Sequence, residues 1–344
     1  MQGALARRVV RWQKVHGRHT LPWQNTRDPY RVWLSEIMLQ QTQVVTVKEY
    51  FARFLLRFPD VHTLSQATLD EVLSLWSGLG YYSRARNLHA CAIQVVQSHG
   101  GKFPETAEIL QTLPGIGRST AGAIASLCFA QRVAILDGNV KRVLTRVLAI
   151  DADLASSANE RALWDQATQA LPNDDLQQTM PRYTQGMMDL GATVCVAKKP
   201  ACEVCPLNDI CLARQSGVPE NYPVKTRKLK RTAKSLWLLW AQSTSGKVLL
   251  SQRPTPGVWA GLYCFALFDS RETLAQCVAR HHQQDLHDAP VFTHVLTHKD
   301  LHLHPVRLTA PVKALNGVEG RWFSLPEASE LGLPAPIRKL LLLG

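Results

Sequence analysis

Four of the eight cysteines lie in one short segment of the chain. They are Cys195, Cys202, Cys205 and Cys211, separated by six, two and five residues. Four thiolates at such spacing can enclose one compact metal centre, either a zinc ion or an iron–sulfur cluster. Four-cysteine zinc sites usually contain two Cys-x2-Cys pairs, and only one occurs here, so the spacing disfavours zinc without excluding it. The other cysteines are scattered among apolar residues and are predicted to be reduced thiols in the core.

Two acidic residues stand where a carboxylate needs a particular reason. Glu36 lies in the otherwise apolar helical run of residues 30–39. It is either paired structurally or works as an acid, because burial raises the pKa of a carboxyl towards neutrality and keeps it protonated. Asp137 separates an apolar stretch from a predicted helix, which it can cap at the N-terminus. A carboxyl that keeps its proton can protonate a leaving group, as one carboxyl does in the hydrolysis of a glycosidic bond.

A glycine-containing turn at residues 113–121 is a third candidate site. Gly115 and Gly117 stand where a tight turn must approach another group closely. Backbone N–H groups at the start of the next helix would face outward and suit a phosphate. The segment at residues 109–126 resembles a helix-hairpin-helix, although an ordinary helix–helix connection can contain the same Pro-Gly turn.

Two kinds of domain must position these residues. From residue 4 to about 213, apolar residues recur at helical spacing, so residues 1–213 are predicted to be all-α. A polar and basic run predicts a linker at residues 214–234. Short strand-like runs then predict a separate α+β domain at residues 235–344. Its predicted strands are residues 235–241, 247–252, 263–267 and 302–308, and its predicted helices lie near residues 273–282 and 337–343.

Charge and hydropathy narrow the class of partner. The formal net charge is +12 and the pI is near 9.5, which favours a polyanion such as nucleic acid. The sequence has no run of roughly 18 uninterrupted apolar residues and no signal peptide pattern. We therefore expect a cytoplasmic protein without a membrane partner.

Three stretches of the helical part carry a specific resemblance. They are Leu-Pro-Trp at residues 21–23, Trp-Leu-Ser-Glu-Ile-Met-Leu-Gln-Gln-Thr at residues 33–42 and Gly-Leu-Gly-Tyr-Tyr-Ser-Arg-Ala-Arg at residues 78–86. With the hairpin and the cysteine spacing, they resemble the adenine DNA glycosylases of the endonuclease III superfamily. The resemblance implies a bacterial base-excision-repair enzyme that acts at the nucleoid, and we expect a monomer. Its implied substrate is double-stranded DNA with adenine opposite 8-oxoguanine or guanine, and its implied cofactor is a [4Fe–4S] cluster bound by the cysteines of residues 195–211.

The same resemblance assigns catalytic roles. Glu36 is implied to protonate adenine at N7, while Asp137 and Asn139 support the sugar cation and the attacking water. Ser119 stands where members that also cut the strand have a lysine that forms a Schiff base. Serine cannot form that bond, so the chain is predicted to hydrolyse the glycosidic bond without efficient strand cleavage. Lys141 is a spare amine nearby, which leaves weak imine formation open.

Further residues match contacts of the family with DNA. An enzyme that acts on a base within a duplex must extrude the nucleotide, and side chains can fill the vacated space. Gln41 and Tyr81 match the family's wedges, and Thr42 matches a contact to the oxidised guanine. The hairpin residues are Gly115, Gly117 and Ser119. The residues that match the adenine pocket are Trp23, Leu39 and Asp189. Each pocket or wedge residue has a structural alternative, because the aromatic and aliphatic side chains suit a core and the acid suits a helix surface.

The C-terminal part resembles the Nudix-related domain of this family at residues 253–265. A catalytic Nudix motif needs a dense group of glutamates for a divalent metal, and the residues after Phe265 contain no such group. We therefore predict a module that inspects the base opposite adenine. Where family members have Phe-Ser-His, this chain has Leu296, Thr297 and His298, so the aromatic ring is lost. The alternation at residues 301–304 predicts one solvated face of histidines rather than a metal site.

Three alternatives stay open from the sequence. One is a pyrimidine-lesion glycosylase with lyase activity, which Glu36, Ser119 and the additional domain disfavour. Another is an iron–sulfur module that binds or senses DNA and whose acids are only structural. The third is hydrolysis of oxidised nucleotides by the tail, which would need metal ligands that the sequence does not show. The basic run of the linker has three equal interpretations, namely DNA binding, docking of another repair protein, and solubility.

Overall fold

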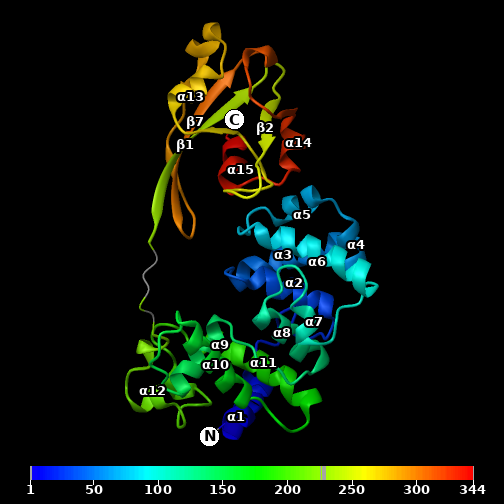
Figure 1. The fold of residues 1–344 in the computed structure, drawn as a ribbon, viewed down its shortest axis with the longest axis vertical. Helices are drawn as coiled ribbons and strands as arrows, with labels where there is room; N and C mark the ends of the chain where they lie inside the picture. The colour runs from blue at the N-terminus through cyan, green and yellow to red at the C-terminus, as the bar shows by residue number, and fades with distance from the viewer. Residues whose placement is uncertain (1, 225, 227–229, 344) are drawn as a thin grey trace. The chain divides into compact units, whose positions relative to one another are not determined.

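The computed structural model describes residues 2–224, 226 and 230–343. It divides into two compact units (Figure 1), of which the first contains Met1–Ser65 and Ala90–Lys228. The second unit contains Gln66–His89 and Leu229–Gly344, so it combines a helical segment of the N-terminal part with the C-terminal part. The domain boundaries expected from composition stay predictions, and Lys225, Arg227 and Lys228 of the predicted linker lie outside the described residues.

The first unit is helical, as predicted, and the structure has no strand among residues 2–224. The segment that contains the four clustered cysteines and the described residues after it, up to residue 224, have only three short helical turns. The helices that lie in this unit wholly or in part are α1 (Gln2–His16), α2 (Pro29–Leu39), α3 (Val44–Arg57), α4 (Val61–Gln66), α6 (Ser83–His99), α7 (Ala107–Leu110), α8 (Arg118–Phe129), α9 (Gly138–Val147), α10 (Ser157–Gln169), α11 (Leu176–Thr193) and α12 (Leu212–Gln215), with 3-10 turns at Cys202–Val204 and Pro219–Asn221.

Local residues fix where the important helices begin. Asp28 caps α2 by accepting the Tyr30 N–H over 3.0 Å, and Pro29 takes the first helical position, where its missing N–H costs nothing. The predicted hairpin turns at Gly115, whose φ of 75° is accessible to glycine without strain. Gly117 then caps α8. The helices that carry the candidate residues are therefore set by short-range sequence signals.

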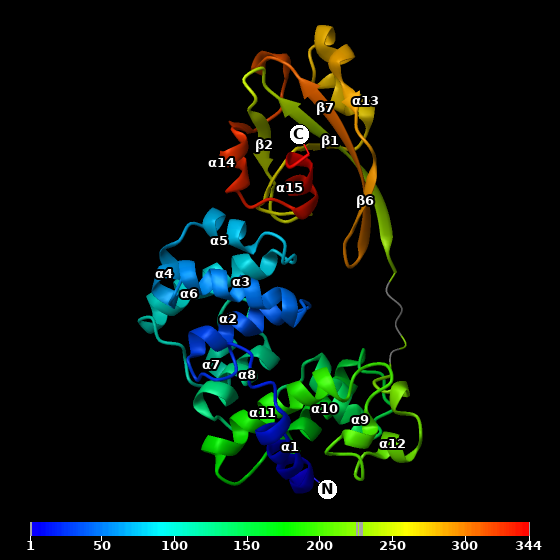
Figure 2. The same ribbon diagram turned by 180° about the vertical axis from the view of Figure 1, so that it is seen from behind.

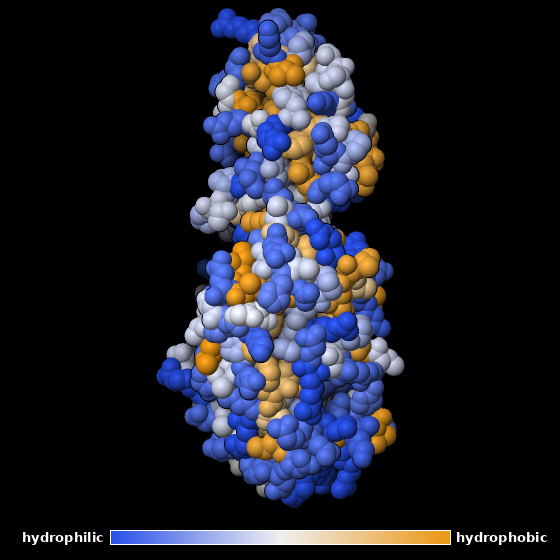
Figure 3. Space-filling model, turned by 90° about the vertical axis from the view of Figure 1, so that its right-hand side faces the viewer, coloured by the Kyte–Doolittle hydropathy of each residue, from blue (hydrophilic) through white to orange (hydrophobic). Residues whose placement is uncertain are grey.

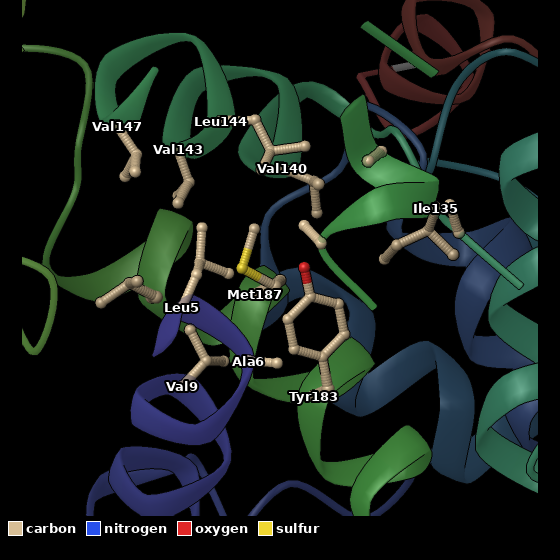
Figure 4. Packing of buried hydrophobic residues seen from close by; sticks show 14 of the residues in the cluster. Leu5, Ala6, Val9, Ile135, Val140, Val143, Leu144, Val147, Tyr183 and Met187 are labelled. Atoms are coloured by element: carbon tan, nitrogen blue, oxygen red, sulfur yellow. The ribbon is translucent and has the colours of Figure 1, made fainter. Parts of the chain in front are cut away.

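One hydrophobic core holds α1, α9 and α11 together. Figure 4 shows side chains from these helices and from the loop that precedes α9 pointing toward one another. The labelled members are Leu5, Ala6, Val9, Ile135, Val140, Val143, Leu144, Val147, Tyr183 and Met187. Burial of each large side chain stabilises the fold by roughly 1.5–3 kcal/mol before entropy is counted. The core thereby fixes the start of α9, at Asp137, against the helix that leads to the first cysteine of the cluster.

The second unit is built around a mixed sheet, which confirms the predicted α+β class. Figure 2 shows β1, β6 and β7 side by side. The strand order is β3-β2-β1-β7-β5, with β8 paired to β2, β4 to β1 and β6 to β7, and β1 runs parallel to β7. The strands are β1 (Thr232–Gln242), β2 (Val248–Gln252), β3 (Tyr263–Cys264), β4 (Ala266–Phe268), β5 (His287–Asp288), β6 (Phe292–Val295), β7 (Lys299–Thr309) and β8 (Arg321–Phe323). The helices are α5 (Leu69–Trp76), the start of α6, α13 (Arg271–Gln276), α14 (Leu325–Ser329) and α15 (Ala335–Leu341), with 3-10 turns at Arg280–Asp285 and Val312–Ala314.

Several elements differ in extent from the prediction. β1 begins at Thr232, within the predicted linker, because its polar first residues pair with the start of β7. The helix expected near residues 273–282 is divided into α13 and the 3-10 turn at Arg280–Asp285. His302 and His304 share one strand face as predicted, but both are half-buried, and His304 stacks on Trp237 with ring centroids 4.3 Å apart.

The surface is mostly hydrophilic on the face that Figure 3 shows. Figure 3 shows hydrophilic side chains over most of one face, with small separate hydrophobic patches. Within the described part of the chain, no helix combines the length and the apolar character needed to cross a membrane.

Candidate active site

Glu36 occupies a half-buried position on α2, between fully or nearly fully buried neighbours. Burial raises the pKa of its carboxyl to about 7, and the negative charge of Asp137 adds to the rise. Among the described residues, no hydrogen bond or ion pair to this carboxyl is formed. Within the part of the chain that the structure describes, the structural pairing considered from the sequence is absent. The environment is that of a carboxylic acid that keeps its proton near neutral pH.

Asp137 is the N-cap of α9, as predicted. Its Oδ1 accepts the Val140 N–H over 2.8 Å, and its Oδ2 accepts the Asn139 Nδ2–H over 3.4 Å. Burial raises the pKa of Asp137, and these hydrogen bonds together with the charge of Arg142 oppose the rise. Since the charge of Asp137 also acts on Glu36, the two carboxyls share one electrostatic neighbourhood, which the sequence alone did not show.

Arg142 connects Asn139 to the loop of the cysteines. Its Nη2 donates to Asn139 Oδ1 over 2.8 Å and to the Gly191 carbonyl over 2.7 Å, and its Nε donates to the Cys195 carbonyl over 2.7 Å. A Cβ at Gly191 would lie 2.6 Å from the Cβ of Asn139, so only glycine allows this close approach of α11 and α9. Sequence reasoning missed Arg142, although its position three residues after Asn139 on one helix face was a usable signal.

A cavity of about 420 Å³ opens beside α2. Its lining includes Trp23, Val32, His19 and Gln24, and its size is typical of small-molecule sites, which span roughly 300–1,000 Å³. Val32 precedes Glu36 by one helical turn on α2. The described residues that line the cavity do not include Glu36, Asp137 or Leu39. Two buried polar atoms in this lining, His19 Nε2 and Gln24 Oε1, have no hydrogen-bond partner in the described structure. A planar ligand with both donors and acceptors would satisfy them.

Asp189, predicted to belong to this region, is fully buried and is not a helix-surface acid. Its carboxylate accepts hydrogen bonds from the backbone N–H and Nε of Arg18, from Gln24 Nε2 and from Gln185 Nε2, at 2.7 to 3.0 Å. Because Gln24 and Gln185 both line the cavity, Asp189 sets the orientation of their amides. No local sequence pattern indicates these partners, because Arg18 and Gln24 lie more than 150 residues away along the chain.

The hairpin residues support the loop that carries Asp137. Ser119 accepts the Leu136 N–H on its Oγ over 3.1 Å, which holds the residue immediately before the candidate carboxylate. Gly117 has open space where a Cβ would project, so an approaching phosphate would meet little obstruction there. Lys141, the spare amine, forms an ion pair with Glu160.

The residues expected to act as wedges have unusual backbone conformations. Gln41 and Tyr81 have φ values of 58° and 48°, in the left-handed region that residues other than glycine rarely adopt. Both are exposed, and such strain is found preferentially at functional positions. Leu39, at the end of α2, and Thr42 are half-buried. Trp23 is buried and packs edge-on against Phe51, so it is both a core residue and part of the cavity wall.

In the second unit, Tyr81 and Thr297 are brought together although they lie 216 positions apart in the chain. The Tyr81 hydroxyl hydrogen-bonds the Thr297 hydroxyl. Both residues line a pocket that also includes Trp259, His294 and His298. The structure therefore places Tyr81, expected as a wedge, beside the Leu296–Thr297–His298 turn, which is expected to reach the oxidised guanine.

The four clustered cysteines line one small pocket in the first unit, with apolar residues from α9 and α11 around them. The buried Arg146 donates to Cys195 Sγ over 3.4 Å, and Cys211 donates to the Arg146 carbonyl over 3.4 Å. No three His, Cys, Asp or Glu side chains in the described ranges are placed to hold a single metal ion, so the pocket does not have the geometry of a mononuclear site. A set of thiols around an otherwise apolar pocket, with a cation beside them, suits an iron–sulfur cluster by its donor chemistry.

Comparisons with known proteins match these parts in the same order. Residues 34–169 match the HhH-GPD superfamily of base excision DNA repair proteins, residues 195–211 match the iron-sulfur binding domain of endonuclease III, and residues 236–343 match the NUDIX domain. The adenine DNA glycosylase of Buchnera aphidicola from Acyrthosiphon pisum is 36% identical over 339 residues, which cover 97% of this chain and 95% of that protein. The human adenine DNA glycosylase is 39% identical over 302 residues, covering 71% of this chain and 54% of that protein.

Solved structures agree at the level of the fold. A thermostable thymine-DNA glycosylase has 26% identity and a TM-score of 0.53 over 61% of this chain and 95% of its own. An endonuclease III in a non-covalent DNA complex has 21% identity and a TM-score of 0.51 over 62% and 94% of the two chains. The predicted fold class and the predicted [4Fe–4S] cofactor are confirmed. Because the matches span nearly the whole chain and include the helical, iron–sulfur and NUDIX segments, this protein belongs to the adenine DNA glycosylase family, whose members act on N-glycosyl bonds in base excision repair.

Proposed function

We propose that the enzyme hydrolyses the bond between adenine and deoxyribose where adenine is paired with 8-oxoguanine or guanine in double-stranded DNA, and that it acts as a monomer. The observation that carries this proposal is the Glu36 carboxyl, whose pKa is raised to about 7 beside Asp137. The extruded adenine would occupy the cavity next to α2, where Trp23 contacts the ring. There Gln24 Oε1 and His19 Nε2 would find the partners that they lack. Leu39 is proposed as a further contact only on its match to the family's adenine pocket.

The two carboxyls then have complementary roles. Glu36 donates its proton to N7 of adenine, which makes the purine a better leaving group. Asp137 is ionised and stabilises the positive charge that develops on the sugar as the bond breaks. Asn139, held by Arg142, hydrogen-bonds Asp137 and helps to place the attacking water. The water adds to the sugar carbon and gives a proton to the Asp137 carboxylate. Adenine takes the electrons of the broken bond and departs as the neutral base, with the proton from Glu36 on N7.

The strand that carries the oxidised base would meet another set of residues. Gln41 and Tyr81 fill the space left by the extruded nucleotide, and Thr42 contacts the base opposite it. Thr297 and His298 inspect the same base from the C-terminal part. The hairpin at Gly115 and Gly117 binds the phosphate backbone through its N–H groups.

The cysteines and Ser119 complete the proposal. Cys195, Cys202, Cys205 and Cys211 would hold the [4Fe–4S] cluster, which when bound crosslinks the loop that Arg142 and Arg146 contact. Ser119 cannot form an imine, and Lys141 is engaged by Glu160. We therefore propose hydrolysis without efficient strand cleavage.

The pH dependence of adenine release tests the assignment of the acid. Glu36 is the active species when protonated, so the single-turnover rate on an A·8-oxoguanine duplex should fall as the pH rises through about 7. It should fall tenfold per pH unit well above that value. A rate that stays level from pH 6 to pH 9 would contradict the proposed role of Glu36.

Replacement of Arg142 by glutamine tests the link to the iron–sulfur loop. It removes hydrogen bonds to Asn139 and to the Gly191 and Cys195 carbonyls. Each charged hydrogen bond contributes about 1.5–3 kcal/mol, so we expect release of adenine to slow by about tenfold to hundredfold. The exposed Arg161 on α10 provides the control variant Arg161→Gln, for which an unchanged rate is expected. Equal rates for both variants would show that the network does not support catalysis.

A further inference from the structure

The turn between β6 and β7 carries Thr297 and His298, which are proposed to inspect the base opposite adenine. One backbone hydrogen bond closes the turn, from the Leu296 N–H to the Lys299 carbonyl over 2.8 Å. β6 has four residues, so strand pairing alone gives the turn limited support. A turn that must distinguish two bases differing in few atoms needs a more rigid backbone than one hydrogen bond and a four-residue strand provide.

Arg231 and Thr232, at the start of β1, supply the additional support. Nη2 of Arg231 donates to the Leu296 carbonyl over 2.9 Å, and its Nη1 donates to the Thr297 carbonyl over 3.2 Å. The Thr232 N–H donates to the His298 carbonyl over 3.1 Å. The carbonyls of Leu296, Thr297 and His298 are thus all held by two adjacent residues. Both of these residues lie in the segment predicted to be a linker.

This arrangement requires arginine in particular. A guanidinium is planar and donates in two directions at once, whereas the ammonium of lysine is a point charge on a flexible stem. Asp300 forms an ion pair with the same guanidinium. The side chains of Arg231 and Asp300 are 40% and 34% exposed, so the ion pair itself contributes little, and the hydrogen bonds to the turn carry the effect. Lys234 of the same basic stretch instead pairs with Asp269.

We propose that Arg231 is a positioning residue for recognition of the base opposite adenine. It fixes the backbone of the turn so that the Thr297 hydroxyl, which meets the Tyr81 hydroxyl, and the exposed His298 ring are presented in one geometry. Arg231 touches no reacting group, so its loss affects discrimination between bases and leaves the chemistry at Glu36 intact. The inference rests on the proposed function, because it assumes that this turn inspects the base.

The test uses the full-length, cluster-loaded enzyme and the variants Arg231→Ala, Arg231→Lys and Lys234→Ala. Single-turnover adenine release is measured with subsaturating enzyme on duplexes that carry adenine opposite 8-oxoguanine or opposite guanine. Amide hydrogen exchange of residues 296–299 is measured in parallel on the free enzymes. Lys234→Ala is the matched control, since it removes a cation of the same stretch that does not contact the turn.

In Arg231→Ala we expect the preference for 8-oxoguanine over guanine to fall by about tenfold, the effect of losing one charge-assisted hydrogen bond. The A·guanine rate should be unchanged, the amides of the turn should exchange faster, and lysine should not restore the preference. The control should retain it. If Arg231→Ala slows release by the same factor on both duplexes and Arg231→Lys restores the rates, Arg231 contacts a phosphate and the inference is overturned. An unchanged preference for 8-oxoguanine in Arg231→Ala would overturn it as well. If the unaltered enzyme shows no preference while the turn loosens in Arg231→Ala, the proposed base inspection itself fails.

Discussion

The Glu36→Gln enzyme is expected to bind duplex DNA with unchanged affinity and to release adenine about 10²–10⁴ times more slowly, the usual contribution of a general acid. Glutamine has nearly the shape of a protonated glutamate but cannot give up a proton to adenine. The fold should survive, because the Glu36 carboxyl forms no hydrogen bond or ion pair within the described residues, and removing a partly buried ionisable group relieves a desolvation cost. The measurements are single-turnover release on an A·8-oxoguanine duplex and a binding titration with the same duplex.

The matched control is Glu49→Gln, which changes an exposed acid on α3. Its rate should equal that of the unaltered enzyme. The Glu36 variant should also lose the decline in rate above pH 7, because the titrating group is gone. A Glu36→Gln enzyme with full activity would remove the central residue of the mechanism.

The second large effect is expected from Asp137→Asn. Asparagine is also a good N-cap, so the bond to the Val140 N–H and the start of α9 should persist. The negative charge that stabilises the sugar cation is lost, which should slow release by about 10²–10³-fold, a range typical for removal of one electrostatic contact to a transition state. Release of adenine under single-turnover conditions and thermal unfolding would be measured on the same preparation.

Asp60→Asn is a suitable control for this variant. Asp60 accepts the Thr63 N–H over 2.8 Å at the start of α4, so it resembles Asp137 as a capping carboxylate but is exposed. Both variants should have similar thermal stability, and only Asp137→Asn should be slow. If the two enzymes were equally active, Asp137 would be only a helix cap, which is the alternative that its sequence position also allowed.

Features set by neighbouring residues could be predicted from the sequence. The helical class, the hairpin turn at Gly115 and the capping position of Asp137 depend on residues a few positions apart, and the structure contains all three. The resemblance to adenine DNA glycosylases also rested on contiguous motifs, and the comparisons confirm it.

Features set by distant residues could not be predicted. Asp189 looks like an ordinary helical acid in sequence, and it is buried because Arg18 and Gln24 reach it from another part of the chain. The polar start of β1 was assigned to a linker because its strand character comes from pairing with β7, more than sixty residues later. Arg231 was one of several basic residues until its contacts with the turn at Leu296 and Thr297 were visible.

The same distinction applies to the catalytic pair. Neighbouring residues in the sequence identify each carboxyl as a candidate functional group, because Glu36 lies in an apolar helix and Asp137 lies at the start of a helix. That they share one environment depends on helices far apart in the chain, because α2 packs against α8, and α8 and α9 both pack against α11. No local pattern reports such a distance, so the joint site had to come from the structure.

The most direct test of the account is single-turnover release of adenine from a duplex with one central adenine opposite 8-oxoguanine. Duplexes with A·G, A·T and thymine glycol serve for comparison, and each reaction is analysed before and after treatment with alkali. The account predicts release from the A·8-oxoguanine duplex, slower release from A·G, and strand breaks mainly after alkali. Cutting at thymine glycol without alkali, or no adenine release by a fully cluster-loaded enzyme, would contradict it.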